Sequence, residues 1–238
     1  MKSLIQIALL VSGIICSSCV APRNEIVVSV ADQRLALYEQ EKLKRVYRVS
    51  TSKFGLGDEP GSYKTPIGSL EIAEKIGGEA KLGAVFKSRK KTGEILAPNA
   101  PGRDPIVTRI LWLKGKGPST SFSYGRYIYI HGTPEERTLG TPTSYGCIRM
   151  SSLGIKDLFD QVSVGSPVVI TTQSLEHVHR MRQREGKEPG KAEKLEASKE
   201  TRILTVDRLR NPPIFASFVI LSTTPLSMAN SASARKRI

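Results

Sequence analysis

The chain has 238 residues, of which 39% are hydrophobic and 24% are charged, enough for one sizeable core with appended segments. Its 36 Lys and Arg against 22 Asp and Glu give a net charge of +14, which suits an anionic partner such as a nucleic acid, a membrane surface or a carboxylate-rich polymer. Because no aromatic-interleaved basic motif or nucleic-acid-binding motif is present, we predict that the partner is not a nucleic acid.

Residues 1–21 have the organisation of a secretory signal. Lys2 precedes an apolar segment, residues 4–15, and small residues follow at Ser17 and Ser18. The segment is too short for a transmembrane span, so we expect export to the periplasm or cell envelope. Cys19 after two serines also resembles a lipoprotein cleavage site, at which the cysteine becomes lipidated, and plain cleavage near residue 21 is the alternative. Membrane contact is then expected only through the signal or a lipid anchor.

Short runs of alternating apolar residues begin at residue 25. β-Branched and aromatic residues are frequent in them, and turn residues separate them, a pattern typical of antiparallel strands. The pattern predicts a mainly β domain, a sandwich or a barrel, over residues 24–172. The predicted strands are 26–30, 34–38, 43–50, 69–73, 106–113 and 167–171.

Residues 75–105 are rich in Gly, Lys and Pro, with residues 82–86 and 94–97 as candidate short strands. The segment is either a functional lid or a solvated insertion, and we favour the insertion. A short helix is predicted after residue 150, with Ser151 or Ser152 as its cap. Its apolar residues recur at i, i+3, i+4 and i+7, namely Ile155, Leu158, Phe159 and Val162.

One cysteine and one histidine form the candidate reactive pair. Cys147 is the single cysteine outside the first nineteen residues, so no disulfide partner is expected in the folded domain. His131 ends an alternating apolar run, and Cys147 lies in a glycine-containing turn. A nearby imidazole can lower the pKa of a thiol and return its proton to a leaving amine, so we expect part of the pair to be thiolate and imidazolium near neutral pH. The alternative is that both residues serve only packing.

The turn before Cys147 can also stabilise an oxyanion. The backbone N–H groups of Tyr145, Gly146 and Cys147 can point at one position, as acyl transfer requires.

A family resemblance rests on these residues. The segments His131-Gly132-Thr133, Gly140 and Ser144-x-Gly146-Cys147-Ile148-Arg149-Met150 resemble the L,D-transpeptidase (YkuD-like) catalytic domain, and Thr65-Pro66-x-Gly68 resembles a second element of it. Tyr145 stands where the family usually has histidine. The resemblance implies that Cys147 is the nucleophile, that His131 transfers protons and that the carbonyl of Gly132 orients the imidazole.

The resemblance implies a reaction on peptidoglycan stem peptides. Cys147 attacks the carbonyl between an L- and a D-centre, and the thioester passes to the amine of a neighbouring stem or of a lipoprotein. Ser144, Tyr145 and Gly146 belong to the oxyanion or substrate region, and Arg149 either holds a substrate carboxylate or forms a structural salt bridge. No metal or organic cofactor is required. The resemblance also implies acylation of the cysteine by carbapenems.

Two other functions remain open. In a non-catalytic peptidoglycan-binding module, Tyr145 has disabled the site. In an L,D-carboxypeptidase-type hydrolase, water takes the thioester.

Residues 173–238 are highly charged, and we predict a disordered tail or a loose helix. His177 and His179 lack a third ligand nearby, so a solvated face is favoured over a metal site. The apolar run 214–221 is too short to cross a bilayer.

Overall fold

The computed structural model describes residues 24–187, which form ten strands and two α-helices. The strands are β1 (Glu25–Ser29), β2 (Arg34–Glu39), β3 (Lys42–Ser50), β4 (Gly68–Ile76), β5 (Ala84–Lys87), β6 (Lys90–Ile95), β7 (Ile106–Gly115), β8 (Tyr129–Gly132), β9 (Ile148–Met150) and β10 (Pro167–Thr171). The helices are α1 (Ser152–Gln161) and α2 (Leu175–Lys187), with 3-10 turns at Pro118–Thr120 and Glu136–Thr138.

Eight of these strands close into a barrel. Their order is β4-β10-β1-β2-β3-β9-β8-β7, and β7 pairs again with β4. The β1–β10 and β8–β9 pairs are parallel, whereas the remaining pairs are antiparallel. Closure leaves these strands without a free edge, and the expectation of a mainly β, barrel-like fold is confirmed.

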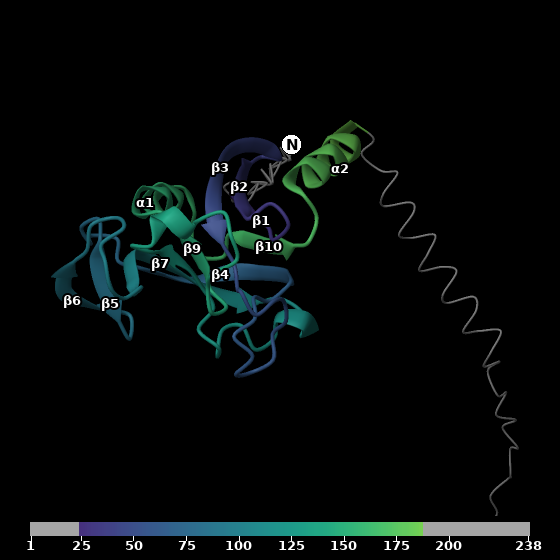
Figure 1. Cartoon of the computed structure of the whole chain (residues 1–238). Helices are drawn as coiled ribbons and strands as arrows, with labels where there is room; N and C mark the ends of the chain where they lie inside the picture. Colours follow the sequence, from purple (N-terminus) through teal and green to yellow (C-terminus); the bar gives the residue numbers. More distant parts are fainter. Residues whose placement is uncertain (1–23, 188–238) are drawn as a thin grey trace, which may run out of the picture. The chain divides into compact units, whose positions relative to one another are not determined.

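Helix α1 packs against the barrel core. The side-chain oxygen of Ser151 accepts a hydrogen bond from the Gly154 amide at 3.1 Å, which makes Ser151 the N-cap, one of the two predicted. Ile155, Leu158 and Phe159 are buried in the same cluster as the inward residues of the strands. In Figure 1, α1 lies beside β9, so the helix that follows the cysteine turn is anchored next to it.

Residues 175–187, the start of the segment predicted as a disordered tail or a loose helix, form the helix α2. Strands β1 and β2 bury both faces, and Leu175 and Val178 pack on the second face, against a cluster that includes Tyr38. Arg182 pairs with Glu25 at 2.5 Å, and its guanidinium lies 4.4 Å from the Tyr38 ring. Two apolar residues thus attach this highly charged helix to the barrel.

The signal segment with Cys19, the apolar run 214–221 and the remainder of the charged tail lie outside the described residues.

Residues 75–105 contain a hairpin, β5–β6, which projects at one side of the barrel (Figure 1). Strand β5 pairs with β7, and Ala84 and Phe86 are buried in a cluster with Trp112, whereas β6 is exposed along its length. The predicted solvated insertion therefore describes only β6, because β5 belongs to the core.

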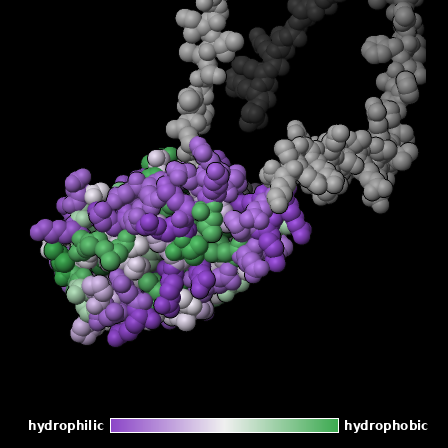
Figure 2. Space-filling model, turned by 90° about the horizontal axis from the view of Figure 1, so that it is seen from above, coloured by the Kyte–Doolittle hydropathy of each residue, from purple (hydrophilic) through white to green (hydrophobic). Residues whose placement is uncertain are grey.

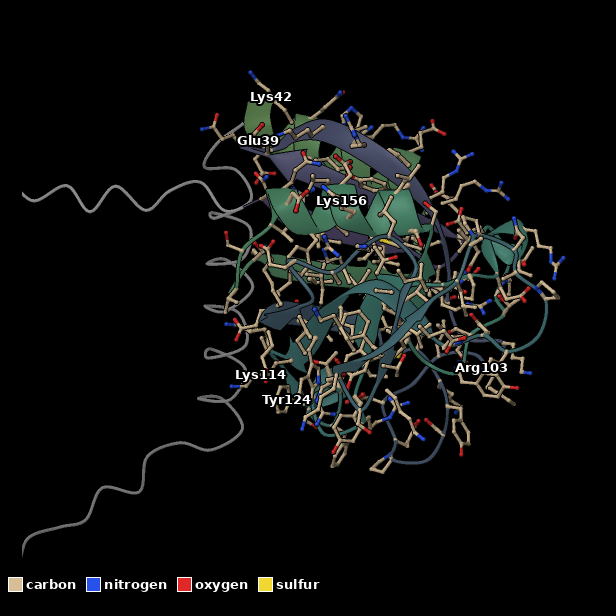
Figure 3. All side chains as sticks on the ribbon, turned by 90° about the vertical axis from the view of Figure 1, so that its left-hand side faces the viewer. Glu39, Lys42, Arg103, Lys114, Tyr124 and Lys156 are labelled. Atoms are coloured by element: carbon tan, nitrogen blue, oxygen red, sulfur yellow. The ribbon has the colours of Figure 1, made fainter. Side chains whose placement is uncertain are left out.

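The face of the molecule seen in Figure 2 is largely hydrophilic. Figure 2 shows hydrophobic residues in separate patches on one face, and Figure 3 shows charged side chains such as Lys42, Arg103, Lys114 and Lys156 pointing outward. Within residues 24–187, no helix is long and apolar enough to cross a membrane.

Candidate functional site

Two neighbouring parallel strands place the predicted pair on one face of the barrel wall. In the β8–β9 ladder, His131 lies opposite Arg149, and Cys147 directly precedes β9. Since side chains alternate between faces along a strand, Cys147 shares a face with Arg149 and so with His131. The Tyr129 amide donates to the Cys147 Sγ at 3.4 Å, and the thiol donates to the Tyr127 carbonyl oxygen at 3.4 Å. The thiol is free and half-buried between these strands.

The imidazole of His131 is held by its neighbour. Nδ1 lies 2.8 Å from the Gly132 carbonyl oxygen, which can only accept a hydrogen bond, so Nδ1 carries the proton. Nε2 of the neutral ring is then the free base. The side chain is buried, and burial lowers its pKa although the Gly132 hydrogen bond and Asp104 act in the opposite direction.

Burial of both groups acts against the expected thiolate and imidazolium. Burial raises the pKa of the Cys147 thiol from 9.0 to about 11, and the Tyr129 amide offsets only part of this effect. With the His131 pKa lowered as well, both groups are neutral at pH 7. The sequence cannot reveal this, because segments distant along the chain create the burial.

The turn before Cys147 is fixed by hydrogen bonds from a neighbouring loop and from within the turn itself. The Thr65 hydroxyl donates to the Gly146 carbonyl oxygen at 3.0 Å, so the loop containing Thr65-Pro66-x-Gly68 does lie beside the turn. The Ser144 hydroxyl donates to the Cys147 carbonyl oxygen at 2.5 Å. Gly146 has a φ of +118°, which favours glycine, so the turn depends on this residue type.

The amides of this turn differ in availability. The Gly146 amide donates to the Ser144 hydroxyl at 3.3 Å. Outside the strand ladders of residues 24–187, no hydrogen bond uses the amides of Tyr145 or Cys147. Two of the three expected donors are thus free for an oxyanion, and Ser144 competes for the third.

Arg149 forms the structural salt bridge that was one of its two predicted roles. Its buried guanidinium pairs with Asp104 and donates to the hydroxyls of Thr138 and Thr143. The Asp104 carboxylate also accepts from the Thr133 hydroxyl. Sequence reasoning missed Asp104 because it lies in the Gly- and Pro-rich segment, where no motif marks it. It connects the strand that bears His131 to the strand that follows Cys147.

The Tyr145 side chain lies in an exposed aromatic group rather than against the thiol. It is 62% exposed, its hydroxyl accepts from Lys53 Nζ at 2.9 Å, and its ring lies 5.4 Å from Phe54 and 6.1 Å from Tyr63. The tyrosine at the usual histidine position thus leaves the His131 and Cys147 contacts intact.

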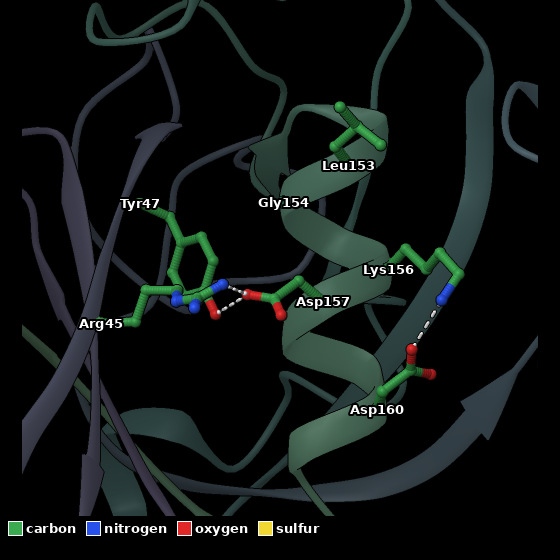
Figure 4. Close-up of a pocket in the computed structure, with 7 residues that line it drawn as sticks. All are labelled: Arg45, Tyr47, Leu153, Gly154, Lys156, Asp157 and Asp160. Carbon is green, nitrogen blue, oxygen red and sulfur yellow. Dashed lines mark hydrogen bonds and ion pairs between the residues drawn. The ribbon is translucent and has the colours of Figure 1, made fainter.

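A cavity of about 490 Å³ lies elsewhere, between β3 and α1 (Figure 4). The Asp157 carboxylate accepts from Arg45 and from the Tyr47 hydroxyl, both at 2.7 Å, and Lys156 pairs with Asp160 at 2.8 Å. Its charges are paired with one another, and none of the motif residues lines it. Within the described residues, no group of three potential metal ligands occurs.

Comparisons with known proteins place this chain in a family. A family model for the L,D-transpeptidase catalytic domain, YkuD, matches residues 23–170. The chain therefore belongs to the YkuD L,D-transpeptidase family.

Two relatives illustrate the extent of the match. YqjB of Bacillus subtilis (strain 168) is 30% identical over 146 residues, which are 61% of this chain and 70% of that protein. A protein of Escherichia coli (strain K12) named "Probable L,D-transpeptidase YcfS" is 30% identical over 156 residues, which are 63% of this chain and 44% of that protein. A solved structure, an L,D-transpeptidase from Mycobacterium smegmatis, is 19% identical with a TM-score of 0.41, over 63% of this chain and 59% of its own.

Proposed function

We propose that this protein is a cysteine-dependent L,D-transpeptidase that acts on peptidoglycan stem peptides. The observation that carries the proposal is the hydrogen bond between His131 Nδ1 and the Gly132 carbonyl oxygen. It orients a neutral imidazole as a base on the strand beside the one that Cys147 precedes. A packing role for the two residues requires neither this tautomer nor the free amides of the adjacent turn.

The reaction begins from the neutral pair. His131 Nε2 removes the thiol proton as Sγ adds to the carbonyl between the L- and D-centres, and negative charge develops on the carbonyl oxygen. The amides of Tyr145 and Cys147 are the candidate donors to this oxyanion. The imidazolium then protonates the leaving amine of the D-residue, the C–N bond breaks, and a thioester on Cys147 remains.

The second half reverses the proton path. The acceptor amine attacks the thioester, His131 removes a proton from that amine, and Cys147 leaves as a thiolate that regains the proton. The product is a new amide to a neighbouring stem or to a lipoprotein. Water as acceptor gives hydrolysis by the same steps. In the non-catalytic alternative, the thioester never forms.

The location follows from the substrate. A wall-directed enzyme must be exported, and the signal-like residues 1–21 support this. We propose a periplasmic or cell-envelope location, with lipid on Cys19 as its form of attachment. Palmitate-analogue labelling of cells should mark the wild type and not Cys19→Ala, and equal labelling of both would remove the anchor while leaving export.

Mass spectrometry separates the three functions. The full chain is incubated with a defined tetrapeptide stem as donor and a stem bearing a free amine as acceptor. Cross-linked product indicates transfer, a shortened stem alone indicates hydrolysis, and an unmodified Cys147 with both stems intact contradicts catalysis. Cys147→Ser and His131→Ala are the inactive controls, and both should give neither product.

A further inference from the structure

Three arginines are candidates for binding an anion near the thiol, and they differ in their partners. Arg126, which acts to lower the Cys147 pKa, is buried and pairs with Asp58 at 2.9 Å. Arg149 pairs with Asp104. Arg89 forms no salt bridge with any carboxylate of residues 24–187. Arg89 is therefore the arginine of this group whose charge is available to a ligand.

An unusual turn places Arg89. Ser88 and Arg89 connect Lys87 and Lys90 at the end of the β5–β6 hairpin, with φ values of +49° and +66°. Two-residue turns with positive φ at both positions normally use Asn and Gly, because other side chains are strained there.

The guanidinium lies over an aromatic surface that reaches the thiol. The Arg89 Cζ is 4.8 Å from the centre of the Trp112 ring and 5.2 Å from that of Tyr127. The Tyr127 carbonyl oxygen accepts from the Cys147 thiol, and Tyr127 also has a positive φ, +59°. The Arg89 guanidinium donates a hydrogen bond to the Tyr129 side chain, and the Tyr129 amide donates to Sγ, so one residue links Arg89 to the thiol. A stacked guanidinium can still donate from its other N–H groups to a ligand.

Arg89 stays cationic, because the hydrogen bond to the Tyr129 side chain raises its pKa and the Glu74 carboxylate acts in the same direction. The neighbouring Glu74 carboxylate accepts a hydrogen bond from the Tyr124 hydroxyl at 2.6 Å. Lys87, Lys90 and Lys91 on the same hairpin are exposed, so solvent and salt screen their charges. An anionic group that approaches the aromatic surface from the hairpin side meets the Arg89 guanidinium.

We propose that Arg89 is a specificity-determining residue that binds a carboxylate of the donor peptide beside the Cys147 thiol. The proposal rests on the transpeptidase function proposed above, and it assigns to Arg89 the carboxylate recognition that Arg149, paired with Asp104, is not free to provide. A planar guanidinium suits a carboxylate because two parallel N–H groups can donate to its two oxygens. The carboxylate is either that of the leaving D-residue or one on the side chain of the donor residue whose carbonyl forms the thioester.

Donor amides test the proposal and distinguish the two carboxylates. Three tetrapeptide donors are compared: one with both carboxylates free, one with the C-terminal group as carboxamide, and one with the side-chain group as carboxamide. Arg89→Gln should lower the acylation rate of the donor with both carboxylates free at least tenfold. For the donor in which the carboxylate that Arg89 binds is already a carboxamide, Arg89→Gln should leave the acylation rate unchanged. Arg89→Lys should recover part of the loss, and Lys90→Gln should resemble the wild type.

A second measurement is independent of transpeptidase activity. Iodoacetate and iodoacetamide alkylate a thiol by the same displacement of iodide, with loss of the thiol proton, but only iodoacetate carries a carboxylate. On the full chain, the rate ratio of the two reagents at Cys147 is read from the mass of the peptide that contains it. Arg89→Gln should lower this ratio severalfold, whereas Lys90→Gln should not, and circular dichroism should show the same folded state for all three proteins.

Equal ratios in the wild type and Arg89→Gln, or equal loss of rate for the free and amidated donors, would overturn the proposal. A wild-type protein that prefers iodoacetate but forms no thioester with any donor would contradict the transpeptidase function and leave the carboxylate site standing.

Discussion

The Nδ1 atom of His131 lies 2.8 Å from the carbonyl oxygen of Gly132, the next residue in the chain. This contact replaces the acidic side chain that orients the histidine in many nucleophilic sites, because a backbone carbonyl can hold the same tautomer. The position of the carbonyl oxygen that orients His131 therefore depends on how Gly132 packs in the barrel wall.

Gly132→Ala tests this dependence. A Cβ at residue 132 would lie 2.5 Å from the Val107 carbonyl oxygen on β7, so strand β8 must shift and move the carbonyl that holds His131. We expect a loss of about 1–3 kcal/mol in unfolding free energy and a lower acylation rate. Gly125→Ala is the control, because its Cβ would lie 3.7 Å from the nearest heavy atom. Urea unfolding of both variants measures the difference, and equal stability would contradict the packing argument.

The reactivity of Cys147 should rise steeply with pH. Burial raises its pKa to about 11, so the thiolate fraction is small at pH 7. As pH rises from 7 toward about 11, that fraction grows tenfold for each pH unit. Iodoacetamide should therefore modify Cys147 more slowly than a free cysteine at pH 7. Rapid alkylation at mildly acid pH would instead support the thiolate and imidazolium pair expected from the sequence. The peptide that contains Cys147 is followed by mass spectrometry.

The same pKa shifts predict the pH dependence of stability. Between pH 9.0 and about 11 the unfolded chain releases the Cys147 proton while the folded protein retains it, so unfolding free energy falls as pH rises. Tyrosines with a raised pKa, such as the half-buried Tyr47, contribute in the same direction. The informative quantity is therefore the difference from Cys147→Ala, which should lose less stability over this range. Parallel curves for the two proteins would contradict the raised pKa.

For His131 the sign reverses. Its pKa lies below 6.5 in the folded protein, so the unfolded chain binds the extra proton as pH falls through 6.5, and stability is lost there. His131→Gln should weaken this acid loss. Thermal unfolding midpoints of wild type and variant from pH 7 to pH 5 measure it.

Asp104→Asn should destabilise the protein. The change leaves the buried Arg149 guanidinium without its carboxylate, which we expect to cost about 1–3 kcal/mol. Arg103→Gln is the control because its pair with Glu94 is exposed, and such pairs contribute about 0–1 kcal/mol. Chemical denaturation compares them, and an equal loss would show that burial does not strengthen the Arg149 pair.

Tyr145→His should change catalysis only modestly. The Tyr145 side chain contacts Lys53, Phe54 and Tyr63, while the contacts of the thiol run through Tyr127 and Tyr129. Carbapenem adduct formation, followed by protein mass, should therefore occur in the wild type at a rate within about tenfold of the variant. Adduct formation in the variant alone would favour the binding-module alternative, and Cys147→Ser provides the zero point.

Much of the local structure could be predicted from the sequence. Alternating apolar residues correspond to the barrel strands, and the i, i+3, i+4 spacing with a serine cap corresponds to α1. The spacing of His131, Gly146 and Cys147 was sufficient to predict the family. These features depend on residues that are near one another in the chain, where periodicity and turn chemistry are readable.

Only the tertiary structure decided which distant residues meet. The β4–β7 pairing closes the barrel, Asp104 reaches Arg149 across 45 positions, and the turn at Ser88 sets Arg89 over Trp112. The protonation state of Cys147 belongs to the same class, because a pKa responds to desolvation by every segment packed around the group. Motif spacing in the sequence identifies the chemical groups of such a site. Their charge depends on burial and on neighbouring groups, and both are established only after the barrel has closed.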